Sequence, residues 1–231
     1  MHHRLLAIFA TVLFSSAACT GWPGDLPVAR AAALYPLDAY ARSVTPGAKL
    51  ACETGEVELT AYRGEHVRYQ KPLRVHPAFK VQLAAFELIV AELAQLHFGR
   101  APRAIVHFGA YACRPMRNHA HWVSEHAFGN AIDVAGFDFA PLPRKDPGFA
   151  AMPKALRKSF SVRVDKDWHG AGEGDPKRAF LHALAERLIA RPDVFRALVG
   201  PDYPGHDNHL HLAHPPYRMV KLGDVERWWF W

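Results

Sequence analysis

The stretch of sequence that decides the fold runs from Ser124 to Asp133 and reads SEHAFGNAID. In a chain of 231 residues with 15 histidines, chance alone produces about one His-x6-Asp pair such as His126 and Asp133. Requiring the serine, glycine and alanine at their positions as well lowers that expectation to about one in a thousand or less. The complete stretch, and not the spacing of its histidine and aspartate alone, therefore indicates a functional site.

A second pair, His209 and His211, follows near the end of the chain in a stretch that alternates as a strand does. Residues two apart on a strand face the same side, so both imidazoles can serve one site. The spacing alone says little, because His119 and His121 repeat it.

The spacing of apolar residues predicts the secondary structure. Between Pro77 and Gly99 they recur every three or four positions, which predicts a helix whose buried face is made of Phe79, Leu83, Phe86, Val90 and Leu93. Alternation and turn residues predict strands over residues 56–62, 103–111, 131–135, 161–165 and 209–213, and helices are expected over 177–190 and 192–199. Strands interleaved with helices predict an α+β fold, a mainly antiparallel central sheet covered by helices.

The N-terminus is typical of an exported protein. A short basic start precedes an apolar run, Leu5–Phe14, that is too short to span a bilayer comfortably, so residues 1–18 are expected to be a signal peptide. Small residues before Cys19 resemble a bacterial lipobox, which predicts a lipid anchor on Cys19 in a periplasmic, membrane-bound protein. Ordinary cleavage nearby, leaving a soluble periplasmic protein, is the alternative.

Export also affects the domain boundaries and the cysteines. Residues 19–50 are rich in Pro, Gly and Ala and are expected to be a tether, residues 51–215 the folded domain, and residues 216–231 an aromatic tail. With Cys19 lipidated, Cys52 and Cys113 remain, and an oxidising compartment favours a disulfide between them. Two buried free thiols are the alternative.

The net charge of +6 suggests an anionic neighbour. Export favours cell-wall polymer or lipid headgroups over nucleic acid, and the sequence holds no dense basic run with interleaved aromatic residues. The terminal stretch Arg227–Trp231 could stack on sugar rings or dock on its own domain. The sequence does not indicate an oligomeric state.

The stretch Ser-x-His-x2-Gly-x-Ala-x-Asp followed by a distant His-x-His resembles the zinc peptidases that include D-Ala-D-Ala carboxypeptidases and murein endopeptidases, and especially the extensin-like C-terminal domain family. Further similarity lies at Cys113–Arg114, Asp167–Trp168, Phe180–Leu181 and Gly200–Pro201. The resemblance implies a zinc-dependent hydrolase that cuts amide bonds in peptidoglycan stem peptides or cross-links. A zinc-containing wall-recognition module without turnover is the other reading.

The resemblance also implies roles for individual residues. His126, Asp133 and His211 would bind Zn²⁺ as two neutral imidazoles and a carboxylate, which leaves a fourth position open for water. His209 would act as general base or hydrogen-bond donor, with His206 supporting it. The other expected roles are a substrate or oxyanion contact for Arg114, a partner of the ligand shell for Ser124, and close backbone approach or an unusual backbone angle at Gly129.

The sequence departs from the family pattern in two places. Carboxypeptidase-like members have a glutamate where this chain has Asn208, which cannot take a proton, so the role of base moves towards His209. A cysteine expected near Arg191 and Pro192 is missing. The remaining histidines that stood out are expected on the surface or in loops: His119, His121, His169 and His214.

Overall fold

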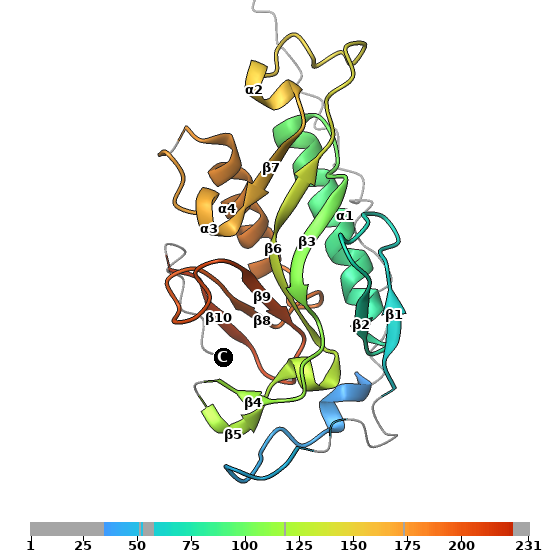
Figure 1. The fold of residues 1–231 in the computed structure, drawn as a ribbon, viewed down its shortest axis with the longest axis vertical. Helices are drawn as coiled ribbons and strands as arrows, with labels where there is room; N and C mark the ends of the chain where they lie inside the picture. Colours follow the sequence, from blue (N-terminus) through green and yellow to red (C-terminus); the bar gives the residue numbers. More distant parts are fainter. Residues whose placement is uncertain (1–34, 51, 53–57, 118, 173, 224–231) are drawn as a thin grey trace, which may run out of the picture.

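The structure, a computed structural model, describes residues 35–50, 52, 58–117, 119–172 and 174–223 (Figure 1). The predicted signal peptide, the lipidation site Cys19, residues 19–34 of the predicted tether and the aromatic residues 227–231 lie outside the described part of the chain.

The described residues form an α+β fold around one six-stranded sheet, as the sequence predicts. Its strand order is β10-β8-β9-β6-β3, with β7 also paired to β6. The β10–β8 pair is parallel and the other pairs of this sheet are antiparallel. The strands are β1 Thr60–Tyr62, β2 Leu73–Val75, β3 Ala104–Gly109, β4 Pro115–Met116, β5 His119–Val123, β6 Ala131–Phe139, β7 Phe160–Arg163, β8 Ala197–Val199, β9 Leu210–Ala213 and β10 Met219–Lys221. The helices are α1 Phe79–Phe98, α2 Lys154–Arg157, α3 Val164–Asp167 and α4 Pro176–Ile189, with 3₁₀ helices at Pro36–Ala39 and Glu125–Phe128.

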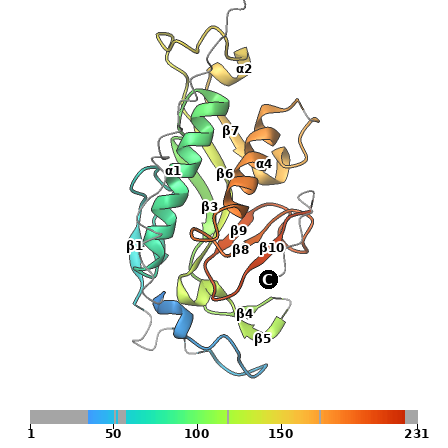
Figure 2. The same ribbon diagram turned by 180° about the vertical axis from the view of Figure 1, so that it is seen from behind.

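Helix α1 is the central element of the core. All five residues of its predicted apolar face are buried, and Gly99 ends the helix with a φ of 68°, which confirms both predictions. By length and composition α1 could cross a membrane, but its buried apolar residues belong to the main core cluster with residues of the sheet. Figure 2 shows α1 and α4 in front of the sheet, so the two long helices cover the same face.

The opposite face of the sheet carries the polar residues. Strands β6 and β9 pair so that Ile132 lies opposite Leu212, and Asp133 lies opposite His211. Because successive side chains of a strand point to opposite faces, the first pair enters the core and the second pair points away from it. This register brings two of the three expected ligands together.

Two predicted elements are wrong in extent or type. Residues 192–199, expected as a helix, form a turn followed by strand β8, which pairs with β9 on one side and β10 on the other. A short apolar run has no clear period, so sheet pairing decided its structure. The strand expected over 161–165 ends at Arg163, whose backbone N–H donates to the Asp167 carboxylate at 2.7 Å as α3 begins.

Residues on both sides of the expected domain pack against it. Strand β10 extends the sheet beyond residue 215. At the other end, residues 35–50 of the expected tether lie against the stretch that decides the fold: Leu37 is fully buried, and the Arg42 carbonyl accepts a hydrogen bond from the backbone N–H of Val123 at 2.6 Å.

The contact between these segments centres on a buried ion pair. Arg42 donates to both carboxylate oxygens of Glu125, at 2.9 and 3.3 Å, and both side chains are only 4% exposed. Asn130 donates to the same carboxylate at 2.6 Å and accepts from the Tyr35 hydroxyl at 2.6 Å. The bonds of Arg42 and Tyr35 connect the N-terminal segment to the Ser124–Asp133 stretch, and the bond between Asn130 and Glu125 lies within that stretch.

Replacing Arg42 with alanine should lower the free energy of unfolding by about 3 kcal/mol, because it leaves the Glu125 carboxylate buried without its cation. Urea titration measures the loss. The exposed Arg144→Ala serves as the control and should change stability by less than about 0.5 kcal/mol. Equal stability of the two variants would show that the pair does not hold the segment in place.

His214 lies in the loop that follows β9, as one of the two expected placements has it, but it is buried and not on the surface. It is 3% exposed, its Nδ1–H donates to the Val194 carbonyl at 3.1 Å, and its ring meets Tyr35 at 4.7 Å between centroids. Burial and, to a smaller extent, the charge of Arg196 lower the pKa of His214 to about 4. The unfolded chain therefore takes up a proton near pH 6.5, where the folded protein does not.

Stability should fall as the pH drops from 6.5 towards 4, since only the unfolded state binds the proton of His214 in that window. The part of the unfolding free energy that depends on His214 is fully present above pH 6.5, and about 3 kcal/mol of it is lost by pH 4. Unfolding free energies measured across this window should vary less steeply in His214→Leu than in the parent. The exposed His121→Leu should leave the slope unchanged, and a slope insensitive to His214 would contradict the assignment.

Candidate metal centre

Three side chains meet on the face of the sheet that the helices leave open. The Nε2 atom of His126 lies 3.1 Å from Asp133 Oδ1 and 3.1 Å from His211 Nδ1, and His211 Nδ1 lies 3.0 Å from Asp133 Oδ1. Ligand atoms around a tetrahedral zinc ion are about 3.3 Å apart. The three atoms are therefore already gathered at nearly the separation that a shared ion requires.

The local chain geometry positions His126. It lies in the 3₁₀ helix Glu125–Phe128, whose N-terminus is capped by Ser124: the Oγ of Ser124 accepts from the backbone N–H of His126 at 3.4 Å. Gly129 ends this helix with a φ of 62°, and a Cβ there would come within 2.8 Å of the backbone nitrogen of His76. Both reasons expected for a glycine at this position are therefore present.

Hydrogen bonding, burial and neighbouring groups set the protonation states of the three side chains. The Nδ1 of His126 lies 3.1 Å from the Ala110 carbonyl, which can only accept, so Nδ1 carries the proton and Nε2 presents its lone pair. Burial alone would raise the pKa of Asp133, but the imidazoles of His126 and His211 beside its carboxylate hold that pKa well below its usual range. Burial lowers the pKa of His211, so its ring is neutral at pH 7.

The donor set fits zinc. Two neutral imidazole nitrogens and one ionised carboxylate oxygen are ligands found in catalytic zinc sites with one open position. Within the part of the chain that the structure describes, His126, Asp133 and His211 are the one group of ligand-type side chains gathered this closely.

His209 joins the same site from the residue before β9. Its Nε2 lies 3.5 Å from Asp133 Oδ1, and its Nδ1–H donates to the side-chain oxygen of Asn208 at 2.8 Å. Burial lowers the pKa of His209 to about 4, although the Asp133 carboxylate opposes the shift. Asn208 therefore orients a neutral His209 whose Nε2 faces the three ligands.

A pocket of about 130 Å³ opens beside the ligands. His206 lines it together with His209 and His211, with ring centroids 4.9 and 5.9 Å away from theirs. The Nδ1–H of His206 donates to the Pro204 carbonyl at 3.2 Å. The three expected catalytic or binding residues Arg114, His206 and His209 thus line the same pocket.

The β4–β5 hairpin supplies the cationic part of the pocket wall. Arg114, just before β4, and Arg117, at the turn, both line the pocket. Among the described residues neither guanidinium forms an ion pair with a carboxylate, whereas Glu125, which also lines the pocket, is paired with Arg42. The pocket can therefore receive a negatively charged group.

Several residues of the site were missed in the sequence. Glu125 and Asn130 lie inside the deciding stretch, yet their roles depend on Arg42 and Tyr35, more than 80 residues away along the chain. Arg117 had a usable signal, because it follows Arg114 by three residues. Trp168, Phe180 and Leu181, which contribute to the family resemblance, are buried core residues and do not line the pocket.

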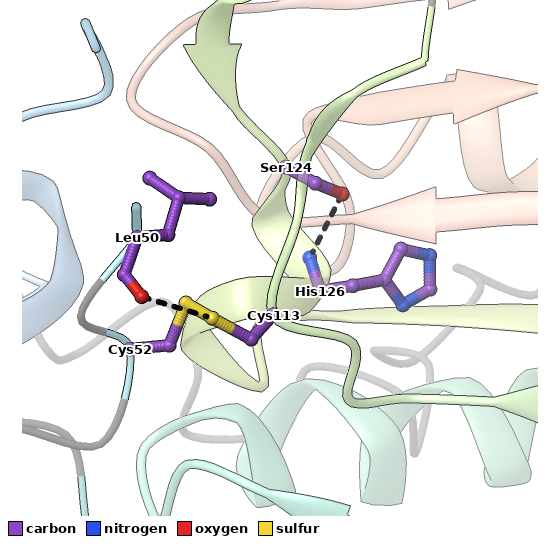
Figure 3. Close-up of a disulfide and its surroundings, with 5 residues drawn as sticks. All are labelled: Leu50, Cys52, Cys113, Ser124 and His126. Atoms are coloured by element: carbon purple, nitrogen blue, oxygen red, sulfur yellow. Dashed lines mark hydrogen bonds between the residues drawn. A yellow bond between two sulfur atoms is a disulfide. The ribbon is translucent and has the colours of Figure 1, made fainter. Parts of the chain in front are cut away.

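The structure joins Cys52 and Cys113 in a disulfide (Figure 3). Cys113 directly precedes Arg114, whose carbonyl accepts from the backbone N–H of Ser124 at 3.2 Å. Figure 3 shows the disulfide beside Ser124 and His126. The bridge thus attaches the segment that leads into the β4–β5 hairpin to the N-terminal segment at Cys52.

Residues 37–142 match the family model described as the extensin-like protein C-terminus, which supports the extensin-like family. The matched range includes His126, Asp133 and the disulfide, and ends before His209 and His211. No curated protein and no solved structure gives a significant match to the chain.

Zinc should raise the melting temperature of the chelator-treated protein, because an ion that binds only the folded state stabilises it by about 4 kcal/mol at a thousandfold excess over its dissociation constant. Asp133→Ala should lose most of the zinc-dependent rise in melting temperature. It should also lose the equimolar zinc content that mass spectrometry measures in the parent. His121→Ala, an exposed histidine outside the pocket, should retain both. An equal increment in Asp133→Ala would rule out the three-ligand site.

Proposed function

We propose that this protein is a zinc-dependent hydrolase that cleaves amide bonds in peptidoglycan stem peptides or cross-links. The observation that carries the proposal is the convergence of three zinc-type ligand atoms within about 3 Å of one another. Two of the three ligand residues, Asp133 and His211, line a pocket together with His209 and Arg114. A zinc ion bound there would supply Lewis-acid activation of water and of a substrate carbonyl.

The chain's own residues account for the proton. His209 is neutral at pH 7, and its Nδ1–H donates to the Asn208 side-chain oxygen. Its Nε2 therefore carries a lone pair and can accept a proton from an attacking water. The same Nε2–H can then donate that proton to the leaving amine. His206, the adjacent imidazole, contacts the rings of both His209 and His211 and supports their placement.

The two arginines of the pocket wall, Arg114 and Arg117, suit the carboxylates of a stem-peptide substrate. Stem peptides carry carboxylates, and a guanidinium binds a carboxylate with two parallel hydrogen bonds. Arg114 is attached at the base of the hairpin by its carbonyl and Arg117 lies at the exposed turn. We assign Arg114 to the group nearest the scissile bond and Arg117 to a more distant carboxylate.

The resemblance to zinc carboxypeptidases and murein endopeptidases supports the same reaction, and the expected signal peptide and lipid anchor on Cys19 would deliver the protein to the periplasm, where peptidoglycan lies. The family match supports the extensin-like part of this assignment.

One observation favours a second candidate, a zinc-containing module that binds cell wall without cutting it. Asn208 occupies the position at which carboxypeptidase-like relatives have a glutamate, and an amide cannot transfer a proton. The module would keep the metal ligands and the cationic pocket but lack turnover.

Digestion of purified sacculi distinguishes the two candidates. The zinc-loaded protein should release new muropeptides, chelator should stop the release, and His209→Ala should lower the rate by about a hundredfold or more with its zinc content unchanged. His121→Ala is the matched control and should keep full activity. Sacculus binding without any released product, in the parent as in His209→Ala, would establish the recognition module instead.

A further inference from the structure

An exposed aromatic residue adjoins His209 outside the pocket. Phe108, near the end of β3, is 60% exposed, and its ring centroid lies 5.7 Å from that of His209 with the planes at 78°. Phe108 is not one of the residues that line the pocket, so it borders the site only along the flank of His209. The proposed reaction gives this side chain no role.

The backbone is specifically shaped to present Phe108. In the β3–β6 pairing His107 lies opposite Val134 and Gly109 lies opposite Asp133, so Phe108 is an extra residue without a partner on β6. Such a β-bulge re-aims a side chain, and bulges are frequent next to active sites. Gly109, with a φ of 143°, supplies the backbone conformation that follows the bulge.

A second irregularity makes the bulge compatible with the metal site. Between Val106 and His107 the pairing skips Ala135 of β6, and the extra Phe108 on β3 restores the register at Asp133. Ala135 lies two residues from Asp133 along β6, and Phe108 is next to Gly109, which pairs with Asp133. The phenyl group and the Asp133 carboxylate are therefore placed by the same stretch of paired backbone.

We infer that Phe108 is a specificity-determining residue that contacts an aliphatic side chain of the peptide substrate next to the scissile amide. The inference rests on the proposed function. The residues beside Phe108 on β3 offer no exposed hydrogen-bonding side chain for a sugar. The Nε2 of His107 donates to the Lys71 carbonyl at 3.0 Å, its Nδ1 is buried, and Gly109 has no side chain. An apolar peptide group suits this surface, while a carboxylate suits the arginines on the pocket side.

The test uses two non-cleavable peptide analogues, in which a CH₂–NH group replaces the scissile amide. Both carry a terminal carboxylate, and they differ in a leucine or a glycine next to the replaced bond. Calorimetry on the zinc-loaded full-length protein should show the leucine analogue binding about tenfold more tightly. Phe108→Ala should remove this preference, and Phe108→Leu should keep most of it.

Two controls separate the subsite from other effects. Trp122→Ala removes a different exposed aromatic side chain, on β5, and should keep the preference. Phe108→Ala should keep its melting temperature and zinc content, since the ring is exposed. Equal weakening of both analogues in Phe108→Ala would assign the ring to holding His209 in place and overturn the inference. So would a parent protein that binds neither analogue or binds both equally.

The outcome is separable from that of the proposed hydrolysis. If the leucine preference depends on Phe108 but sacculi are never cleaved, the peptide subsite stands and the hydrolase proposal falls. If sacculi are cleaved and Phe108→Ala leaves the preference intact, the hydrolase proposal stands and this inference falls.

Discussion

The register between β6 and β9 is the constraint on which the rest of the site depends. Asp133 lies directly opposite His211, so one carboxylate and one imidazole share a face and a position. A slip of one residue would turn either side chain into the core beneath α1. The core prevents the slip, because the same strands bury Ile132, Val134, Leu210 and Leu212 on the other face.

The third ligand depends on a different interaction. His126 is not on the sheet, and its place is determined by a capped 3₁₀ helix that Gly129 ends with a left-handed backbone. The buried pair of Arg42 and Glu125 attaches that helix to the N-terminal segment. A buried pair of this kind costs desolvation and is weak support for net stability, but it strongly disfavours any arrangement that separates the partners. Specific placement of the helix is therefore its main contribution.

The environment of the site differs between its two flanks. On the pocket side Arg114 and Arg117 line the wall without a carboxylate partner among the described residues, while on the other side Phe108 leaves the β3–β6 ladder at a bulge. His209 stands between them, neutral because it is buried, and oriented by Asn208. Asn208 thus has a structural use that does not require it to transfer a proton.

The sequence by itself determined the features that depend on local spacing: the apolar face of α1 and its end at Gly99, most strands, and the candidate ligands of the Ser124–Asp133 stretch. These features follow from the periodicity of apolar residues and from the chemistry of residues that are close together in the sequence. Only the tertiary structure decided that residues 197–199 form a strand, that Arg42 pairs with Glu125, that His214 is buried and that Phe108 borders His209. Each of these depends on a partner brought close by sheet pairing or core packing from a distant part of the chain, and local spacing carries no information about such partners.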